Sequence, residues 1–276
     1  MTTLEKDALT ALVFKDWKPA EKDKAIEHPF IKLNPDHKGK EQMLLRPLHV
    51  LKLNDSRAVL LLAAEPVGAW HGMPGVLSAY WFKRTGENWS LDKRQEEVDF
   101  LGIFGRFDDT SLHELWPGHF ALAVYSHQAG GGEEGTNLSL FKIDEQQVST
   151  ITSEGGLMIS SSTEGTLGCE ERMKQVPGKK LRKRYNDIET QPVQCYDLKT
   201  TWSIKKGQTA PGDLMLETSA RIFSNKEIGQ DADPDGESYI NYELTAQRKH
   251  DKQVFHYDPA AGVYQLHSRK KLLPDR

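Results

Sequence analysis

Short apolar segments separated by polar turns run through most of the chain, and this alternation constrains the fold more than any other feature. Four pairs of such segments flank a turn, at 51–62, 80–91, 138–151 and 254–266. Their turns are rich in Asn, Asp, Gly and Pro, which adopt the tight conformations that connect antiparallel strands. The sequence therefore predicts an all-β fold of antiparallel hairpins. Because the hairpins recur at no fixed period, we expect a meander arranged as a sandwich or an irregular propeller-like sheet.

One segment near the N-terminus has helical spacing instead. Its apolar residues lie three and four positions apart on one stripe: Leu4, Ala8, Leu9, Leu12 and Val13. This stripe predicts a short helix that docks on the sheet and is ended by Pro19. The charged, proline-interrupted residues 18–42 then predict an extended arm or loop.

A change in composition between 153 and 194 marks a candidate domain boundary. This stretch contains a glycine pair, a serine run and a basic run. We expect an N-terminal helix and charged arm at 1–42, a β-rich lobe at 43–153 and a second β-rich lobe at 154–276. The alternative is one continuous domain, which a chain of 276 residues also allows for an all-β protein.

Composition excludes several classes of protein. The formal net charge is −4, whereas nucleic-acid-binding domains are usually strongly basic, so we expect no nucleic-acid partner. The best apolar run is 58–64, far below the ~18 residues of a membrane-spanning helix, so we expect no membrane span. The N-terminus also lacks the apolar stretch of a secretory signal peptide. The chain is thus either cytoplasmic or the mature part of an exported protein, and we favour the second.

Two cysteines, Cys169 and Cys195, enclose a polar, basic segment. They are too few for a disulfide-dense scaffold and form no CxxC motif of a redox or zinc site. A disulfide between them would stabilise the fold by roughly 3 kcal/mol through loop closure. Two unrelated buried thiols remain the alternative.

An acidic stretch resembles the start of a calcium-binding loop. Asp231, Asp233 and Asp235 occupy its first three ligand positions, and Gly236 follows. Tyr242 stands where the loop needs a bidentate Glu, and Pro234 is atypical. An acidic turn without a metal is therefore the favoured interpretation, and we expect no other cofactor.

Catalytic motifs are missing from the sequence: it contains no HExxH, GxSxG, GxGxxG or GxxxxGK[ST] pattern. We therefore predict a protein that is not an enzyme. Candidate partner-contacting segments are 69–75, 130–135 and the basic run 179–184. The alternative interpretation of the basic run is a solvated loop with no binding role. Their candidate contact residues are Trp70, His71, Glu133, Glu134, Lys180, Arg182 and Arg184.

Several short stretches carry a resemblance to secreted β-rich proteins of Gram-negative bacteria. They are EGTLGCEER, CYDLKTTWSIKKG, DLMLETSAR, the aromatic hairpin YWFKRTGENWSLDKR and the phrase DFLGIFGRF. Some members of that group are similar to immunity proteins paired with type VI secretion effectors. The likeness covers residues 44–224. It implies an envelope location and a disulfide between Cys169 and Cys195, and it transfers no catalytic residue.

The leading hypothesis is a periplasmic, non-enzymatic binding protein that neutralises a secreted toxin by covering the toxin's active site. Aromatic anchors with a polar rim are typical of such interfaces. The alternative is a carbohydrate-binding module or hydrolase of the envelope that uses a cluster of tryptophans. Its candidate stacking residues are Trp70, Trp81, Trp89, Trp116 and Trp202.

Overall fold

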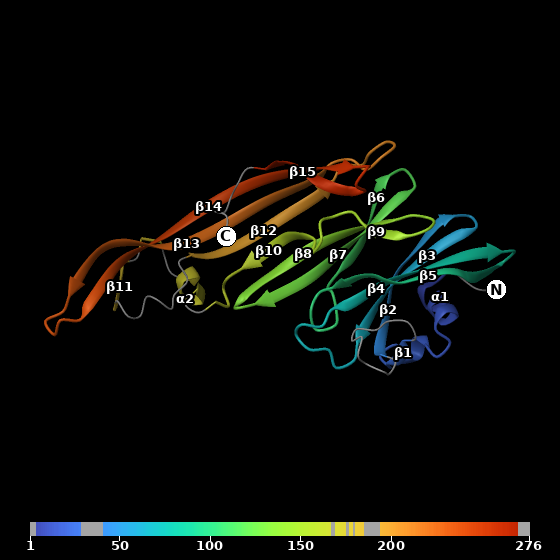
Figure 1. Ribbon diagram of the computed structural model, residues 1–276, viewed down its shortest axis with the longest axis horizontal. Helices are drawn as coiled ribbons and strands as arrows, with labels where there is room; N and C mark the ends of the chain where they lie inside the picture. The colour runs from blue at the N-terminus through green and yellow to red at the C-terminus, as the bar shows by residue number, and fades with distance from the viewer. Residues whose placement is uncertain are drawn as a thin grey trace.

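The computed structural model describes residues 4–28, 41–166, 169–174, 177–178, 180–184 and 194–269. Figure 1 shows an elongated molecule made of two antiparallel β-sheets, with the N-terminal sheet at one end and a long hairpin at the other. The prediction of an all-β fold is confirmed, since 65% of the residues are in strands and 6% in helices.

The first sheet has five strands that pair in chain order. They are β1 (Ile26–His28), β2 (Glu41–Asn54), β3 (Arg57–Pro66), β4 (Gly75–Thr85) and β5 (Asn88–Leu101). The side chains of β3 from Ala58 to Ala64 are buried on both faces. A strand covered on both faces is apolar at every position rather than at every second one, which explains the uninterrupted apolar run in the sequence.

The helix α1 (Lys6–Val13) covers one face of this sheet. Leu9 and Val13 are buried as the sequence predicts, but Leu12 is 39% exposed and Thr10 takes a buried position. The helix also ends at Val13 and not beside Pro19, because Phe14 is already extended. Phe14 and Trp17 pack with the helix in the same apolar cluster on the first sheet.

The segment after the helix forms more structure than an arm. A single 3₁₀ turn, η1 (Pro19–Glu21), is followed by β1, which pairs with the start of β2. A strand of three residues is too short to show a period-two pattern, so β1 could not be predicted from the sequence. The rest of the predicted arm, 29–40, lies outside the described residues.

The second sheet has ten strands. Eight form one path in the order β11-β14-β13-β12-β10-β8-β7-β6, and two lie off it, β15 on β14 and β9 on β8. Its strands and the second helix are β6 (Thr110–Trp116), β7 (His119–Gly130), β8 (Glu133–Ile143), β9 (Val148–Thr150), β10 (Leu157–Ser162), α2 (Cys169–Lys174), β11 (Lys180–Arg184), β12 (Gln194–Ile204), β13 (Leu214–Ala232), β14 (Ser238–Asp258) and β15 (Val263–Arg269). Since β10 pairs with both β8 and β12, one sheet crosses the candidate boundary at 153.

The two sheets pack face to face through an apolar interior that includes Trp81, Leu122 and Phe141. The turn between β8 and β9 locks them together. The indole Nε1 of Trp81 donates to the Asp144 carbonyl at 2.9 Å. The Gln95 side chain on β5 pairs with both backbone groups of Val148, accepting from its N–H at 3.0 Å and donating to its carbonyl at 2.9 Å. This arrangement is a sandwich over part of the length, not a propeller.

The predicted hairpins at 51–62, 80–91, 138–151 and 254–266 all form. The glycine-rich segment 130–135 forms a tight hairpin turn at Gly131 and Gly132, both with positive φ. A Cβ on Gly132 would lie 2.6 Å from the Gly165 carbonyl oxygen, so the close approach requires glycine. The segment 238–258 forms the single long strand β14.

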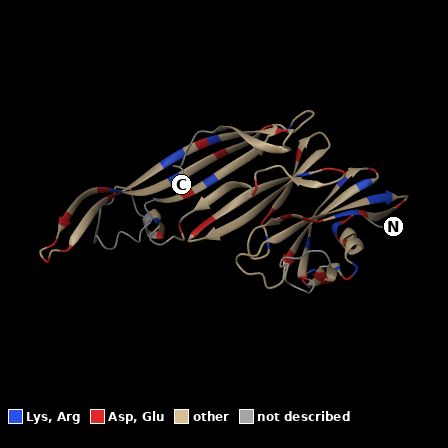
Figure 2. Ribbon diagram, in the orientation of Figure 1, with Lys and Arg blue, Asp and Glu red and all other residues tan. Residues whose placement is uncertain are grey.

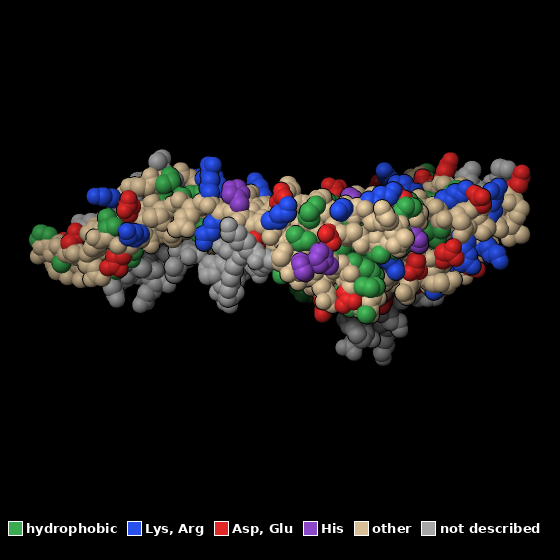
Figure 3. Space-filling model, turned by 90° about the horizontal axis from the view of Figure 1, so that it is seen from above, with side chains coloured by type: hydrophobic (Ala, Val, Ile, Leu, Met, Phe, Trp, Pro, Cys, Tyr) green, Lys and Arg blue, Asp and Glu red, His purple; other side chains and the backbone are tan. Residues whose placement is uncertain are grey.

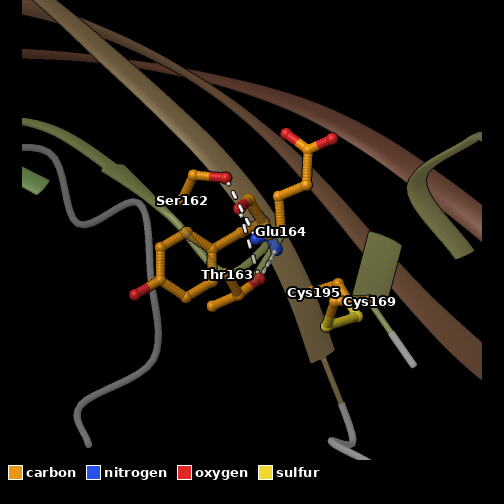
Figure 4. The surroundings of a disulfide bond; sticks show 6 residues. Ser162, Thr163, Glu164, Cys169 and Cys195 are labelled. Atoms are coloured by element: carbon orange, nitrogen blue, oxygen red, sulfur yellow. Dashed lines mark hydrogen bonds between the residues drawn. A yellow bond between two sulfur atoms is a disulfide. The ribbon is translucent and has the colours of Figure 1, made fainter. Parts of the chain in front are cut away.

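Cys169 and Cys195 form a disulfide, with their Cα atoms 5.5 Å apart. It ties the start of α2 to β12, and both sulfurs are buried beside Phe223. Figure 4 shows the adjoining contacts, in which the Thr163 hydroxyl accepts the Tyr196 N–H at 2.8 Å. The sequence left open a disulfide or two unrelated buried thiols, and the structure contains the disulfide.

A buried polar cluster lies between α1 and the first sheet. His28 is fully buried, with its Nε2 3.6 Å from Glu96 Oε2. The Tyr80 hydroxyl donates to the same carboxylate, and Arg94 lies 3.4 Å from its other oxygen. Burial, with a smaller contribution from Arg94, lowers the pKa of His28 from 6.5 to about 4. Burial also raises the pKa of Glu96.

This cluster predicts a loss of stability in mild acid. Between pH 6.5 and about 4 the unfolded chain protonates His28 while the folded protein keeps it neutral, so stability present above pH 6.5 falls by up to about 3 kcal/mol. Glu96 offsets part of this loss, because its raised pKa lets the folded state take up a proton first. Urea unfolding across this range should show the slope in the wild type and a flatter profile in His28→Gln. The exposed His71→Gln control should keep the wild-type slope.

Candidate functional site

Among the described residues, the most exposed aromatic side chains lie on two neighbouring loops at one end of the strands of the first sheet. The loop 67–74 joins β3 to β4, and the loop 102–109 joins β5 to β6. Trp70 is 65% exposed and Phe104 50%. His71, which is also exposed, contacts Phe104 edge-on with ring centroids 5.2 Å apart. We call Trp70, His71 and Phe104 the aromatic platform.

Close backbone contacts hold the two loops against each other. The Gly105 N–H donates to the Met73 carbonyl at 2.7 Å. A Cβ on Gly105 would lie 2.6 Å from the Ala69 Cβ, and one on Gly75 would lie 2.7 Å from the Gly105 carbonyl oxygen. Substitution at either glycine would force the loops apart. The two loops that carry the platform are therefore held together by close backbone contacts and do not move independently.

Phe104 has a backbone conformation that its residue type disfavours. Its φ is +54°, and within the described residues it is the one position other than glycine with a positive φ. Gly105 follows with φ +74°, and the Arg106 N–H reaches back to the Ile103 carbonyl at 3.3 Å, which closes a tight turn. Turns with two positive φ values favour Asn, Asp or Gly at the first central position. Strain of this kind is typical of functional sites.

Within the loop 67–74, Trp70 is supported by its own turn. The Met73 N–H donates to the Trp70 carbonyl at 2.9 Å, and the indole lies over Gly72, where a Cβ would be 2.5 Å from the ring. The glycine therefore provides the space that the ring occupies. Two further apolar side chains near the platform are exposed: Val67 begins the loop 67–74, and Phe100 lies near the end of β5, just before the loop 102–109.

Charged groups border this end of the sheet. Arg46 forms an ion pair with Glu65 on the neighbouring strand, and its pKa is lowered by burial and by nearby Arg106. Arg106 itself is exposed directly after the Phe104 turn. An apolar centre with a charged rim is the arrangement expected for a protein–protein contact.

The three candidate contact segments are not brought together. Figure 1 places the loop 67–74 by the first sheet, the turn after β7 near the middle and β11 towards the far end. Only the first of them carries exposed aromatic residues. Trp70 and His71, singled out from the sequence, thus lie in the site, whereas the others lie elsewhere.

Glu133 and Glu134 flank the β7–β8 turn in different environments. Glu134 is exposed, while the Glu133 carboxylate accepts hydrogen bonds from Ser161, at 3.0 Å, and from the Tyr196 hydroxyl. Both residues line a hollow of about 300 Å³ together with Met158. Glu133 is therefore oriented by its own sheet.

The basic run belongs to a strand rather than to a solvated loop. The backbone of β11 pairs with β14, with Lys180 opposite Glu243, Arg182 opposite Asn241 and Arg184 opposite Tyr239. Lys180 is exposed. Lys179 and the side chains of Arg182 and Arg184 lie outside the described residues.

The acidic stretch forms the turn at the end of the β13–β14 hairpin, where Figure 2 shows red residues at the far tip. Asp233 caps this turn by accepting the N–H groups of Asp235 and Glu237 at 3.0 and 2.9 Å. Asp231 accepts from the Asn241 side chain at 3.3 Å. Over the described part of the chain, no three His, Cys, Asp or Glu side chains are placed to hold a metal ion.

The tryptophans do not form one exposed cluster. Trp81 is 1% and Trp89 7% exposed, so both are core residues. Trp116 stacks on His119 with ring centroids 4.1 Å apart, and Trp202 packs on His113 at 4.7 Å. Trp70 alone among the five is mostly exposed, so the sheet face of stacked tryptophans expected for a carbohydrate site is not present.

Phe104 is the site residue that sequence reasoning missed. Its signal was the Gly-Ile-Phe-Gly segment at 102–105, in which glycines flank an aromatic residue.

No helix in the described part of the chain has the length and apolar character needed to cross a membrane. Comparison with known proteins yields no matching protein-family model and no matching curated protein.

Proposed function

We propose that this protein is a non-enzymatic binding protein that holds a protein partner through the aromatic platform. The observation that carries the proposal is Phe104, an exposed aromatic side chain kept on a strained backbone beside exposed Trp70. Folding alone favours glycine or asparagine at that backbone position. A gain in binding is a physical reason for a sequence to retain phenylalanine there.

The rigid mounting of the loops favours this role. Binding costs free energy when loops and side chains must be ordered at the interface. Here the contact between Gly105 and Ala69 orders both loops before any partner arrives. Exposed tryptophans and other aromatic residues that enter a partner's pocket account for much of the binding energy in protein complexes.

The partner that we propose is a secreted toxin, whose active site the platform would cover, with the protein acting as an immunity protein in the bacterial periplasm. The disulfide supports a non-reducing compartment, because such bonds persist mainly outside the cytosol. The partner class follows from the short stretches that resemble secreted β-rich proteins of Gram-negative bacteria, because some of those proteins are similar to type VI immunity proteins.

A direct test searches the genes beside this one for a secreted toxin, and measures binding to that toxin and protection of growth against it. Trp70→Ala should weaken binding by at least about thirtyfold. Phe104→Gly should weaken binding while it raises the free energy of unfolding by up to about 1 kcal/mol, since glycine relieves the strain. Met158→Ala is the matched control, because Met158 is 49% exposed but lies on β10.

The decisive result is that Phe104→Gly weakens binding and at the same time raises the free energy of unfolding. If Phe104→Gly lowers stability, the residue serves folding and the proposal loses its main support. If Trp70→Ala and Met158→Ala bind equally well, the platform is not the interface. A protein that protects no cell from the neighbouring toxin and retains no protein partner is not an immunity protein.

A further inference from the structure

The outer face of the long hairpin carries a cationic hollow that the proposed partner binding does not use. Its volume is about 390 Å³, and it is lined by Asp197, Lys199, Ser219, Arg221, Arg248 and His250. Figure 3 shows blue side chains gathered around a histidine over this part of the molecule. The platform, by contrast, lies on the first sheet.

The register of the strands explains how the positive charges meet. Arg221 on β13 is directly opposite Arg248 on β14, and Ser219 is opposite His250 in the next row on that face. On the other side, β12 places Asp197 opposite Arg221 and Lys199 opposite Ser219. The hollow thus combines three cationic side chains and a histidine with one carboxylate.

The arginine pair works against the stability of the sheet. Like charges directly opposite each other on neighbouring strands are unfavourable. Within the described part of the chain, neither Arg221 nor Arg248 forms an ion pair with a carboxylate. Two rows further along the same face, these two strands carry the complementary pair Glu217 and Lys252, 3.1 Å apart. The arginine pair, with the single carboxylate of Asp197 opposite Arg221 on β12, therefore carries excess positive charge and is a local exception on this face.

The remaining contacts keep one guanidinium in place. The Arg221 guanidinium lies over the Phe223 ring, 5.0 Å from its centroid. Phe223 is itself buried beside the disulfide, so the support is rigid. The positive charge of Arg221 is thus positioned by packing and remains available on the outer face.

We propose that this hollow binds a phosphate-bearing ligand, with the phosphoryl oxygens between Arg221 and Arg248. Guanidinium groups bind phosphate through paired N–H donors, which makes arginine the usual residue for this chemistry. A group with two negative charges compensates the arginine pair, and Lys199 and His250 supply further donors at its edge. The phosphate can belong to a free small molecule or to a lipid headgroup.

The test titrates the whole protein with inorganic pyrophosphate at low ionic strength and follows heat and Tm. The wild type should bind saturably and gain Tm. Arg248→Gln should weaken binding by about tenfold or more, the effect of losing one charged hydrogen-bonding partner. Without pyrophosphate the same variant should have a higher Tm than the wild type, because the opposed charges are gone.

Lys252→Gln is the matched control, since it removes the same charge from the same strand face outside the hollow. Its affinity for pyrophosphate should stay within about twofold of the wild type, with only screened long-range effects. No saturable binding by the wild type, or an equal loss in both variants, would overturn the proposal. Sedimentation with phosphatidylcholine vesicles, with and without phosphatidic acid, then separates the sources: only a lipid ligand gives Arg248-dependent sedimentation.

Discussion

Replacing both cysteines by alanine, in Cys169→Ala with Cys195→Ala, is expected to lower the free energy of unfolding by about 3.5 kcal/mol. The bond joins residues 26 positions apart, so its loss returns considerable conformational freedom to the unfolded chain. Alanine suits the buried site beside Phe223 and leaves no unpaired thiol. Urea denaturation of the variant and of the wild type measures the difference.

Reduction of the wild type gives an independent measure of the same bond. A reducing agent should shift the wild-type midpoint towards that of the double variant and leave the variant unchanged. A loss below about 1 kcal/mol would contradict a structural role for the bond. The result also bears on location, because a protein that depends on this disulfide must keep it oxidised.

Trp81→Ala is expected to be more damaging still, by about 4 kcal/mol or more. The Trp81 ring is 1% exposed and lies in the interior shared by the two sheets. Its indole also holds the turn at Asp144 through the 2.9 Å hydrogen bond. The substitution removes a large apolar volume and this link at once, so the packing between the sheets should weaken.

The matched variant Trp81→Phe separates these two contributions. It keeps most of the ring but loses the N–H donor, so it should cost about 1–2 kcal/mol. Backbone amide exchange should then accelerate at the turn 144–147 in both variants. Equal destabilisation by the two substitutions would show that the hydrogen bond, and not the packed volume, dominates at this position.

Turn chemistry is the part of the fold that local sequence specifies. Asn54 shows why: its side chain accepts the Ser56 N–H at 2.9 Å, so the residue makes the turn by itself. Positive φ at Gly86 closes the next hairpin in the same local way. Such contacts depend on residues a few positions apart, which is why the hairpins could be predicted.

Pairing between hairpins has no comparable local signal. Nothing near β10 indicates that it pairs with both β8 and β12 and so carries one sheet past residue 153. Likewise, Trp70 and Trp81 are equally plausible as core or contact residues from the sequence, and only the structure shows Trp81 buried and Trp70 exposed. Burial depends on which surfaces meet, and therefore on the whole fold.

The sequence by itself determined the all-β class, the hairpin turns and Trp70 and His71 as candidate contacts, because each rests on residue type and short-range spacing. Tertiary structure decided that the cysteines bond and that Phe104 joins the platform. It also placed Arg221 opposite Arg248. These outcomes depend on strands and loops distant in the chain, whose register is set by burying apolar faces against each other. For that reason the strained backbone of Phe104 cannot be predicted from the local sequence and is recognised only in the folded structure.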